Sequence, residues 1–228
     1  GFAGSLITAL TGIEIALWDL KGKALKTPIY ELLGGKFRDD IRVYCDCEVE
    51  PGMDMAEIRQ VVDGVLEAGF SALKIDLDMF AYGHRGKETA SFVKDQFNMT
   101  PGRWEHDRMV ELASMVVEAA GPGIDVAADL HTRLDTHSSV RLARALEPLH
   151  LMWLEEPVPP ENVDAMREIT QSTSTPICAG ENLFLRQGFR DLIEKQAVDI
   201  IMPDIPKCGG LSECRKIANM AEIYYMPF

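Results

Sequence analysis

Ionisable side chains stand at or near the ends of five successive apolar runs in this sequence. A single aspartate in such a place commonly caps a helix. The same habit in five consecutive runs instead predicts one shared site, provided that the runs are parallel strands whose ends meet. The residues concerned are Lys74, Asp76, Asp129, His131, Glu155, Glu181 and Asp204.

Three of these residues, Asp129, Glu155 and Glu181, are carboxylates from neighbouring runs. Buried carboxylates are costly unless they are paired or bound to a metal. A ligand set of oxygens, without thiolate or imidazole, favours Mg²⁺ over zinc or copper. We therefore expect a Mg²⁺ site here. The adjacent Glu156 would point to the other side of its strand, where a structural hydrogen bond or ion pair is expected.

Residues two apart on a strand point the same way, which pairs Lys74 with Asp76 and Asp129 with His131. Lys74 stands between apolar neighbours in "ALKID". A lysine inside a buried run and close to carboxylates is expected to be functional. For His131, the residues alone leave a structural and a functional role equally open.

The apolar runs alternate with amphipathic stretches of helical spacing, such as "MAEIRQVVDGVLEAG" at 55–69. Short apolar strands joined by helices predict a parallel sheet that is buried on both faces. Repeated units favour a (β/α) barrel, whose full form needs eight strands and about 250 residues. A doubly wound open sheet is the alternative, but no GxGxxG follows the first run. The runs lie at 41–45, 71–76, 124–129, 151–155, 176–181, 198–204 and 224–228.

The first 40 residues differ from the rest and predict two helices. The first, at 6–25, has Ile13, Leu17, Leu20 and Ala24 on its apolar side, and the second begins after Pro28. We expect residues 1–40 to be a helical connector and residues 41–228 to be a partial barrel with strands 1 to about 7. Because the chain starts with Gly and stops within an apolar run, we expect both a start and an end to be missing.

Composition excludes several classes of function. The 228 residues carry a formal charge of −13 with no basic stripe, so a nucleic-acid partner is not expected. The sequence has no signal peptide and no apolar run long enough to span a membrane. Five cysteines without a CxxC pair predict reduced thiols in a cytoplasmic protein. A homo-oligomer is expected, and the long connection at 77–104 is expected to be a lid or substrate-contact element.

With these residues in view, the sequence resembles the mandelate racemase branch of the enolase superfamily. The matching stretches include "TGIEIALWDLKGKALKTPIYELLGG", "LKID", "DVAADLHTR", "WLEEPVPPEN", "PICAGENLF" and "IIMPDIPKCGGLSECRKIA". The resemblance implies an N-terminal α+β capping domain, missing from this chain, followed by a modified TIM-type barrel. It also implies that Asp129, Glu155 and Glu181 bind Mg²⁺, which holds the substrate carboxylate and stabilises an enediolate.

Two details resemble the acid-sugar dehydratases of the galactonate and gluconate type. Lys74-Ile75-Asp76 replaces the Lys-x-Lys of the racemases, and Asp129-Leu130-His131 replaces their Asp-x-Asn. The resemblance implies that His131 is the general acid for the leaving 3-hydroxyl. It implies that Asp204 orients a base histidine on the seventh strand, expected just after Phe228. Lys74, Asp76 and His131 would contact the substrate, with Lys74 orienting its carboxylate.

The expected function is therefore Mg²⁺-dependent dehydration of an aldonic acid, a small-molecule acid sugar, to a 2-keto-3-deoxy acid. A racemase, epimerase or cycloisomerase of the same superfamily is an alternative, although proton exchange on two faces requires a base on each. A relative that has lost activity and serves as a binding or regulatory protein is a third possibility. The retained carboxylate set argues against it.

Overall fold

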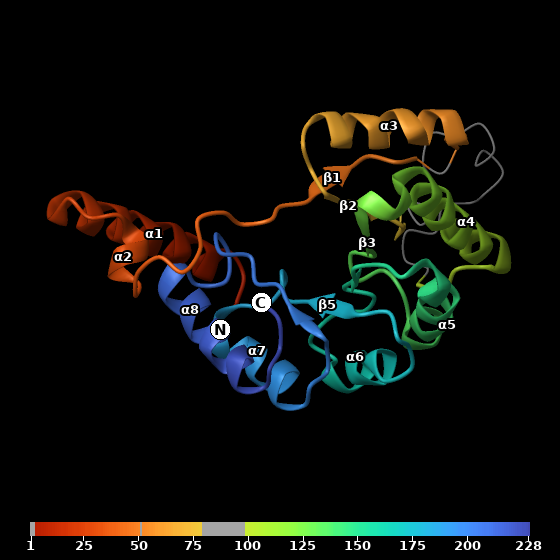
Figure 1. Cartoon of the computed structure of the whole chain (residues 1–228). Helices are drawn as coiled ribbons and strands as arrows, with labels where there is room; N and C mark the ends of the chain where they lie inside the picture. Colours follow the sequence, from red (N-terminus) through yellow and green to blue (C-terminus); the bar gives the residue numbers. More distant parts are fainter. Residues whose placement is uncertain (1–2, 51, 79–98) are drawn as a thin grey trace. The chain divides into compact units, whose positions relative to one another are not determined.

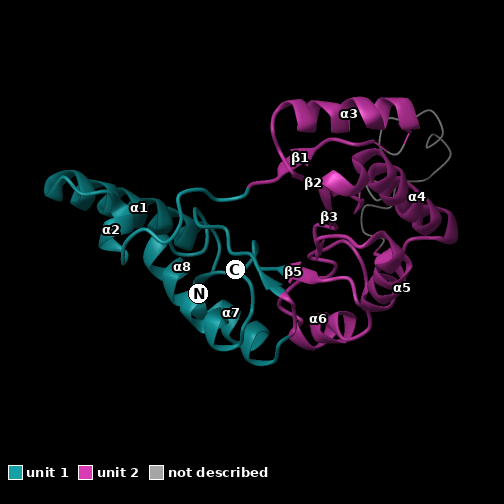
Figure 2. Ribbon diagram, viewed as in Figure 1, with its two compact units in different colours: residues 1–42, 179–196, 200–228 teal, residues 43–178, 197–199 magenta. Residues whose placement is uncertain are grey.

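The computed structural model describes residues 3–50, 52–78 and 99–228 (Figure 1). The chain forms two compact units, shown in different colours in Figure 2. Unit 1 comprises residues 1–42, 179–196 and 200–228, and unit 2 comprises residues 43–178 and 197–199. The boundary expected near residue 40 between a connector and a barrel stays a prediction.

The strands form a parallel sheet in which sequence order and spatial order agree. Each strand therefore pairs with the next one along the chain, and the order never reverses. A doubly wound sheet has a point of reversal between its two halves, so this order belongs to a modified TIM-type (β/α) barrel, incomplete in this chain. The strands are β1 (Cys45–Cys47), β2 (Ala72–Asp76), β3 (Asp125–Asp129), β4 (Leu154–Glu155), β5 (Ile177–Ala179) and β6 (Ile200–Ile201).

The helices of unit 2 follow one another along one side of its strands (Figure 1). The first, α3, begins at a capping box in which Asp54 and Glu57 satisfy each other's backbone N–H groups. It ends two residues before Gly69, whose φ of 84° is left-handed. The helices are α3 (Met55–Glu67), α4 (Arg103–Ala120), α5 (Thr136–Leu146) and α6 (Val163–Thr170), with 3₁₀ turns at Gly121–Gly123 and Glu147–Leu149.

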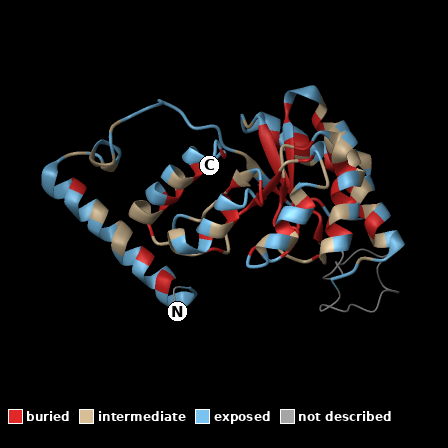
Figure 3. Ribbon diagram, turned by 90° about the horizontal axis from the view of Figure 1, so that it is seen from below, coloured by how far each residue is buried: buried red, intermediate tan, exposed pale blue. Residues whose placement is uncertain are grey.

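The centre of unit 2 is the pair β2 and β3, where buried residues concentrate (Figure 3). Leu73 and Ile75 on β2 and Ala127 on β3 have no exposed surface. Strands covered on both faces need continuous apolar sequence, which is why these runs read as apolar. The rigid pair fixes the positions of the polar residues at its carboxyl end.

In unit 1, α1 (Ser5–Leu25) packs against α8 (Leu211–Ile223) through polar contacts. The Glu14 carboxylate accepts the backbone N–H groups of Leu211 and Ser212 at 2.9 and 3.0 Å. The Glu14 side chain therefore satisfies two backbone N–H groups at the N-terminus of α8. Unit 1 also contains α2 (Ile29–Leu32) and α7 (Leu185–Glu194).

Two expected strands and one expected helix face differ from the structure. The first run forms a strand only at Cys45–Cys47, because this edge strand is paired only where it lies beside Leu73–Ile75 of β2. Within the described residues 224–228 there is no strand, although the Ile201 N–H donates to the Pro227 carbonyl at 2.9 Å. Pro227 lacks the N–H that would continue a ladder.

The apolar side expected for α1 is exposed in unit 1, where Ile13, Leu17 and Leu20 are each at least 59% accessible. The buried side instead contains Ile7 and Thr11. Polar contacts with α8 determine which face of α1 turns inward. The apolar pattern within α1 does not predict these contacts.

Three further expectations concern membrane-spanning helices, the cysteine thiols and a lid. Among the described helices, none has the length and apolar character needed to cross a bilayer. All five cysteines are free thiols, in agreement with the expected reduced state. The lid expected at 77–104 falls mostly on residues 79–98, which lie outside the described residues.

Gly180 permits a close approach of two segments in unit 1. Its φ is 143°, and a Cβ there would lie 2.9 Å from both the Met202 carbonyl oxygen and a ring carbon of Phe189. We expect Gly180→Ala to lower the free energy of unfolding by about 2 kcal/mol or more, through overpacking and backbone strain. The same change at Gly188 in α7, where a Cβ makes ordinary contacts, should raise it by up to about 1 kcal/mol. Urea unfolding of both variants checks the opposite signs, and a stable Gly180→Ala protein would contradict the packing.

The Glu14 contact should make stability depend on pH. Partial burial raises the pKa of Glu14, but hydrogen bonds from Ser212, Trp18 and Leu211 outweigh it and leave the pKa below its ordinary value. The stabilisation is therefore present above about pH 4.5 and is lost as the pH falls through the lowered pKa. We expect Glu14→Gln to cost about 1 kcal/mol at pH 7 and less at pH 3.5, as measured by urea unfolding. Equal costs at both pH values would contradict the ionic character of the contact.

Candidate active site

Three adjacent strands of unit 2 bring one lysine and two carboxylates together. Asp129 is the last residue of β3 and is paired in register with Glu155, the last residue of β4. Lys74 of β2 extends toward them, and its Nζ donates to Asp129 Oδ2 at 2.6 Å and to Glu155 Oε2 at 3.2 Å. The structure thus brings these three predicted site residues into direct contact, and their roles stay predictions.

Burial makes the charges of this cluster strongly interdependent. Asp129 and Glu155 are each 2% exposed and Lys74 is 8% exposed. Burial, followed by the Asp129 charge, raises the pKa of Glu155 to about 7. Burial also opposes the charge on Lys74, but hydrogen bonding to Asp129 and the charge of Glu155 outweigh it and raise the pKa of the ammonium. Two carboxylates therefore share one permanent cation.

Two aromatic residues, Tyr44 and Trp153, complete the surroundings of this cluster. The Trp153 indole N–H donates to Glu155 Oε2 at 3.2 Å. The ring of Trp153 meets that of Tyr44 edge-on, with centroids 5.4 Å apart, and Lys74 Nζ lies 5.8 Å from the centre of the Tyr44 ring. Sequence reasoning missed both, because aromatic residues in an apolar run read as core. The spacing of two between Trp153 and Glu155 was the available signal.

His131 lies just beyond β3, in a backbone turn rather than on the strand. Its φ is 44° and that of Thr132 is 61°, both left-handed. The His131 N–H donates to Asp129 Oδ1 at 3.0 Å, and the Thr132 N–H donates to the carbonyl of Glu156 at 2.7 Å. Glu156 itself has a φ of 35°. Such conformations cost energy and cluster at functional sites, so the main chain here is held in place by its contacts.

The imidazole of His131 faces the cluster and a further carboxylate, Asp78. Its Nδ1 lies 3.1 Å from Asp78 Oδ1, and its Nε2 lies 3.7 Å from Asp129 Oδ2. The hydrogen bond with Asp78, with the charge of Asp129, raises the pKa of His131 to about 9 in spite of partial burial. Asp78 is 2% exposed. Sequence reasoning missed it, although Lys74, Asp76 and Asp78 continue one alternation.

Asp76 ends β2 beside Asp129 and belongs to a second possible ligand group. One atom each from Asp76, Asp129 and His131 lies within 4.8 Å of the other two. Burial raises the pKa of Asp76, while the nearby His131 opposes that rise. Asp129 is common to this group and to the buried pair with Glu155, so it stands between the two possible positions for a cation.

The donor set fits a hard divalent cation. Asp129 and Glu155 direct an oxygen each at one point, which the Lys74 ammonium occupies. One ammonium against two carboxylates leaves a negative balance, and oxygen donors suit such an ion. The flexible stem of lysine allows its head to move aside. Of the two groups, the pair with Glu155 offers only oxygen, whereas the other includes an imidazole, so the first is the better fit.

Glu181 and Asp204 belong to unit 1 and are described with the neighbours found there. The Asn182 amide donates to Glu181 Oε1 at 3.2 Å, and Lys207 Nζ donates to Asn182 Oδ1 at 2.9 Å. The Asp204 carbonyl accepts the N–H groups of Lys207 and Cys208 in the turn after β6. The ligand role of Glu181 and the orienting role of Asp204 stay predictions.

A cavity of about 290 Å³ lies at the opposite end of β3. It is lined by residues that include Asp125, the first residue of β3, and His150. In barrels the catalytic groups gather at the carboxyl ends of strands. The cavity is therefore separate from the cluster around Asp129.

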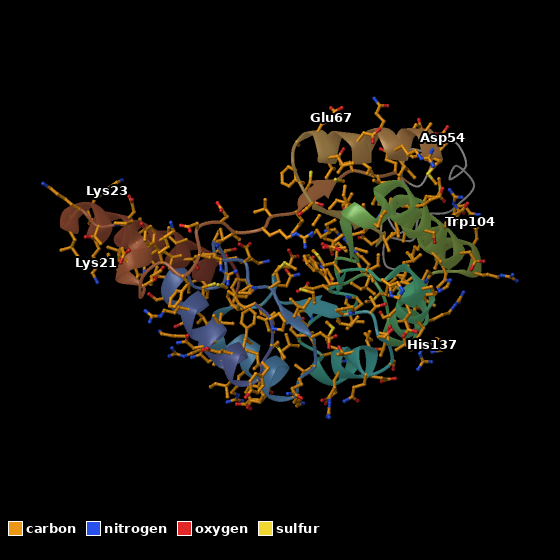
Figure 4. The ribbon with its side chains drawn as sticks, in the orientation of Figure 1. Lys21, Lys23, Asp54, Glu67, Trp104 and His137 are labelled. Carbon is orange, nitrogen blue, oxygen red and sulfur yellow. The ribbon has the colours of Figure 1, made fainter. Side chains whose placement is uncertain are left out.

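The Lys74 contact predicts a large cost when its charge is removed. Lys74→Met leaves two buried carboxylates without a partner, and we expect the metal-free protein to lose about 3–5 kcal/mol of unfolding free energy. Mg²⁺ should then raise the melting temperature more in this variant than in the wild type. Lys23 offers a matched control, because its ion pair with Asp19 is also 2.6 Å long but is exposed (Figure 4). Lys23→Met should change stability by no more than about 0.5 kcal/mol, and equal effects of the two substitutions would contradict the prediction.

Comparison with known proteins gives two family matches. Residues 56–228 match the family described as enolase C-terminal domain-like. Residues 2–34 match the mandelate racemase / muconate lactonizing enzyme N-terminal domain.

Individual relatives are similar along nearly the whole chain. A D-xylonate dehydratase of Haloferax volcanii is 46% identical over 99% of this chain and 53% of its own length. A D-galactonate dehydratase of Variovorax paradoxus is 35% identical over 98% of this chain and 53% of its own length. The chain thus spans about half the length of these relatives.

A solved structure, that of a mandelate racemase/muconate lactonizing enzyme-like protein from Rubrobacter xylanophilus, superposes with a TM-score of 0.88 at 46% identity. It covers all of this chain, which spans 59% of that protein. Together with the family matches, this similarity shows that the chain belongs to the mandelate racemase / muconate lactonizing enzyme family of the enolase superfamily.

Proposed function

We propose that this chain is part of a Mg²⁺-dependent hydro-lyase that converts an aldonic acid to a 2-keto-3-deoxy acid through an enediolate. The observation that carries the proposal is the buried contact of Lys74 with Asp129 and Glu155. His131 stands beside that contact and supplies an acid. The names of the D-xylonate and D-galactonate dehydratases support the substrate class, a small acid sugar.

Asp129, Glu155 and Glu181 are the residues proposed to hold Mg²⁺. When bound, the ion would neutralise the charge that develops on the substrate carboxylate as the α-proton leaves. Burial and the charge of Asp129 raise the pKa of Glu155, and a cation bound at this place would favour the ionised form of the carboxylate.

Lys74 is proposed to orient the substrate carboxylate rather than to remove a proton. Its two carboxylate contacts raise its pKa, so the side chain stays an ammonium at neutral pH. An ammonium has no lone pair to accept a proton, but it attracts an anion. Asp76, half-buried beside Asp129, is proposed to contact the substrate from the same edge.

His131 is proposed to be the general acid, and Asp204 to orient a base histidine beyond Phe228. A departing hydroxyl leaves poorly unless it is protonated. The Nε2 of His131 faces Asp129, and its pKa of about 9 keeps a proton available at neutral pH. Two-sided proton exchange, as in a racemase, requires a base on each face, and the ammonium of Lys74 supports elimination instead.

The proposal predicts that activity and Mg²⁺ binding are lost together. The full-length protein should convert at least one member of a panel of aldonic and aldaric acids to a 2-keto-3-deoxy product. EDTA should stop the reaction and Mg²⁺ restore it. Glu155→Gln, which removes one ligand charge and little volume, should lower kcat/KM by at least about 100-fold and weaken Mg²⁺ binding in calorimetry.

Glu67→Gln is the matched control, because Glu67 is exposed at the end of α3 (Figure 4). It should leave both kcat/KM and Mg²⁺ affinity unchanged. Wild-type turnover by Glu155→Gln would refute the metal assignment. Normal Mg²⁺ binding with no turnover of any acid would favour a regulatory relative, and racemisation without dehydration would favour the other enzyme class.

A further inference from the structure

Asp78 is a buried carboxylate to which the proposed function assigns no role. It is 2% exposed, and its Oδ1 lies 3.1 Å from His131 Nδ1. Among the residues that the structure describes, its Oδ2 has no hydrogen-bond partner, and it lies 3.8 Å from Arg133 Nε. A buried charge is costly without a partner. The contact with His131 provides such a partner for the Asp78 carboxylate.

The contact determines which ring nitrogen of His131 carries a proton. An ionised carboxylate can only accept hydrogen bonds, so His131 Nδ1–H must donate to Asp78. The other nitrogen, Nε2, then faces Asp129 Oδ2 at 3.7 Å. The hydrogen-bond partner of one ring nitrogen determines the protonation of the other. Here the contact with Asp78 directs Nε2 toward the carboxylate cluster.

The main chain alone cannot make this choice. The left-handed turn at His131 and its N–H bond to Asp129 fix the direction of the Cα–Cβ bond. Rotation of the ring by half a turn would still put Cδ2 in the place of Nδ1 and Cε1 in the place of Nε2, because this torsion is broad and two-fold. Asp78 is the contact that distinguishes the two orientations.

We infer that Asp78 is a positioning residue that fixes the orientation and the tautomer of His131 for proton donation from Nε2. This inference rests on the proposed dehydration. In that step the Nε2–H bond of the His131 imidazolium breaks and its proton joins the 3-hydroxyl oxygen, which leaves the neutral ring as the Nδ1–H tautomer. The oxygen departs as water with the electron pair of the C3–O bond. The Nδ1–H remains bonded to Asp78 throughout, and solvent returns a proton to Nε2.

A purely structural pairing of Asp78 with Arg133 is the competing explanation. In that case Asp78 would serve to neutralise the arginine, and removal of either partner would have the same effect. The two explanations differ at Arg133, because Arg133→Gln removes the ion pair and leaves the Asp78–His131 bond in place.

Nitrogen NMR of the histidine ring tests the inference without any need for activity. ¹⁵N shifts of His131 are recorded in the metal-free protein while the ring is neutral, with His131→Asn used to assign the signals. The wild type and Arg133→Gln should both show the Nδ1–H tautomer. Asp78→Ala should shift the population toward Nε2–H. Asp78→Asn, which keeps the volume of the side chain, should shift it less and guards against misfolding of the alanine variant.

Kinetics on the same variants then tests the role in catalysis. Asp78→Ala should lower the kcat for dehydration by about 10- to 100-fold, while Arg133→Gln should not. Exchange of the substrate α-proton with solvent deuterium should persist in Asp78→Ala and in His131→Asn, because only elimination needs the acid. Mg²⁺ affinity in calorimetry should stay unchanged in Asp78→Ala.

An unchanged tautomer in both Asp78 variants would overturn the inference, as would equal effects of Asp78→Ala and Arg133→Gln. Loss of Mg²⁺ binding in Asp78→Ala would also overturn it, because Asp78 would then belong to the metal ligands. A wild-type protein that binds Mg²⁺ but dehydrates no acid sugar would refute the proposed function and the catalytic role of Asp78 together. A failure confined to Asp78 appears instead as an unchanged ring spectrum in a protein that is active.

Discussion

The arrangement of the site depends on one buried ammonium held between two buried carboxylates. Lys74 contacts Asp129 at 2.6 Å and Glu155 at 3.2 Å, from three strands that are hydrogen-bonded in succession. Burial raises the pKa of Glu155, so its ionised form needs a cation nearby. The contact allows the strands to end in charged residues at a buried position, where apolar residues would otherwise be expected. It also leaves one negative charge unbalanced, which a divalent ion can use.

The surrounding side chains hold this charge in a defined geometry. Trp153 and Tyr44 form an apolar wall with a single N–H directed at Glu155. On the other side, Asp129 uses one oxygen for Lys74 and the other for the backbone of His131. Each oxygen of Asp129 therefore has a separate task, and the position of the lysine is coupled to that of the histidine through one carboxylate.

The spacing of the apolar runs and the charges at their ends were sufficient to predict that Asp129, Glu155 and Lys74 lie close together, because parallel strands place their carboxyl ends at one edge. They did not reveal Asp78, since β2 ends at Asp76 and the path of the chain beyond a strand depends on contacts that alternation does not encode. Trp153 was hidden by its apolar character. The inward face of α1 could not be predicted for a related reason. The Glu14 carboxylate of this helix accepts the backbone N–H of Leu211, which lies 197 residues away in the sequence.

The left-handed backbone at His131 limits which residues can occupy that position. Among residues with a side chain, asparagine, aspartate and histidine adopt such a φ more readily than others, and β-branched residues adopt it rarely. The racemase-like Asp-x-Asn and the Asp-x-His of this chain both satisfy that restriction. A single substitution can therefore exchange one branch's residue for the other's without remodelling the main chain. The backbone at this position therefore favours a few polar side chains of different acidity, of which histidine is the one that can give up a proton near neutral pH.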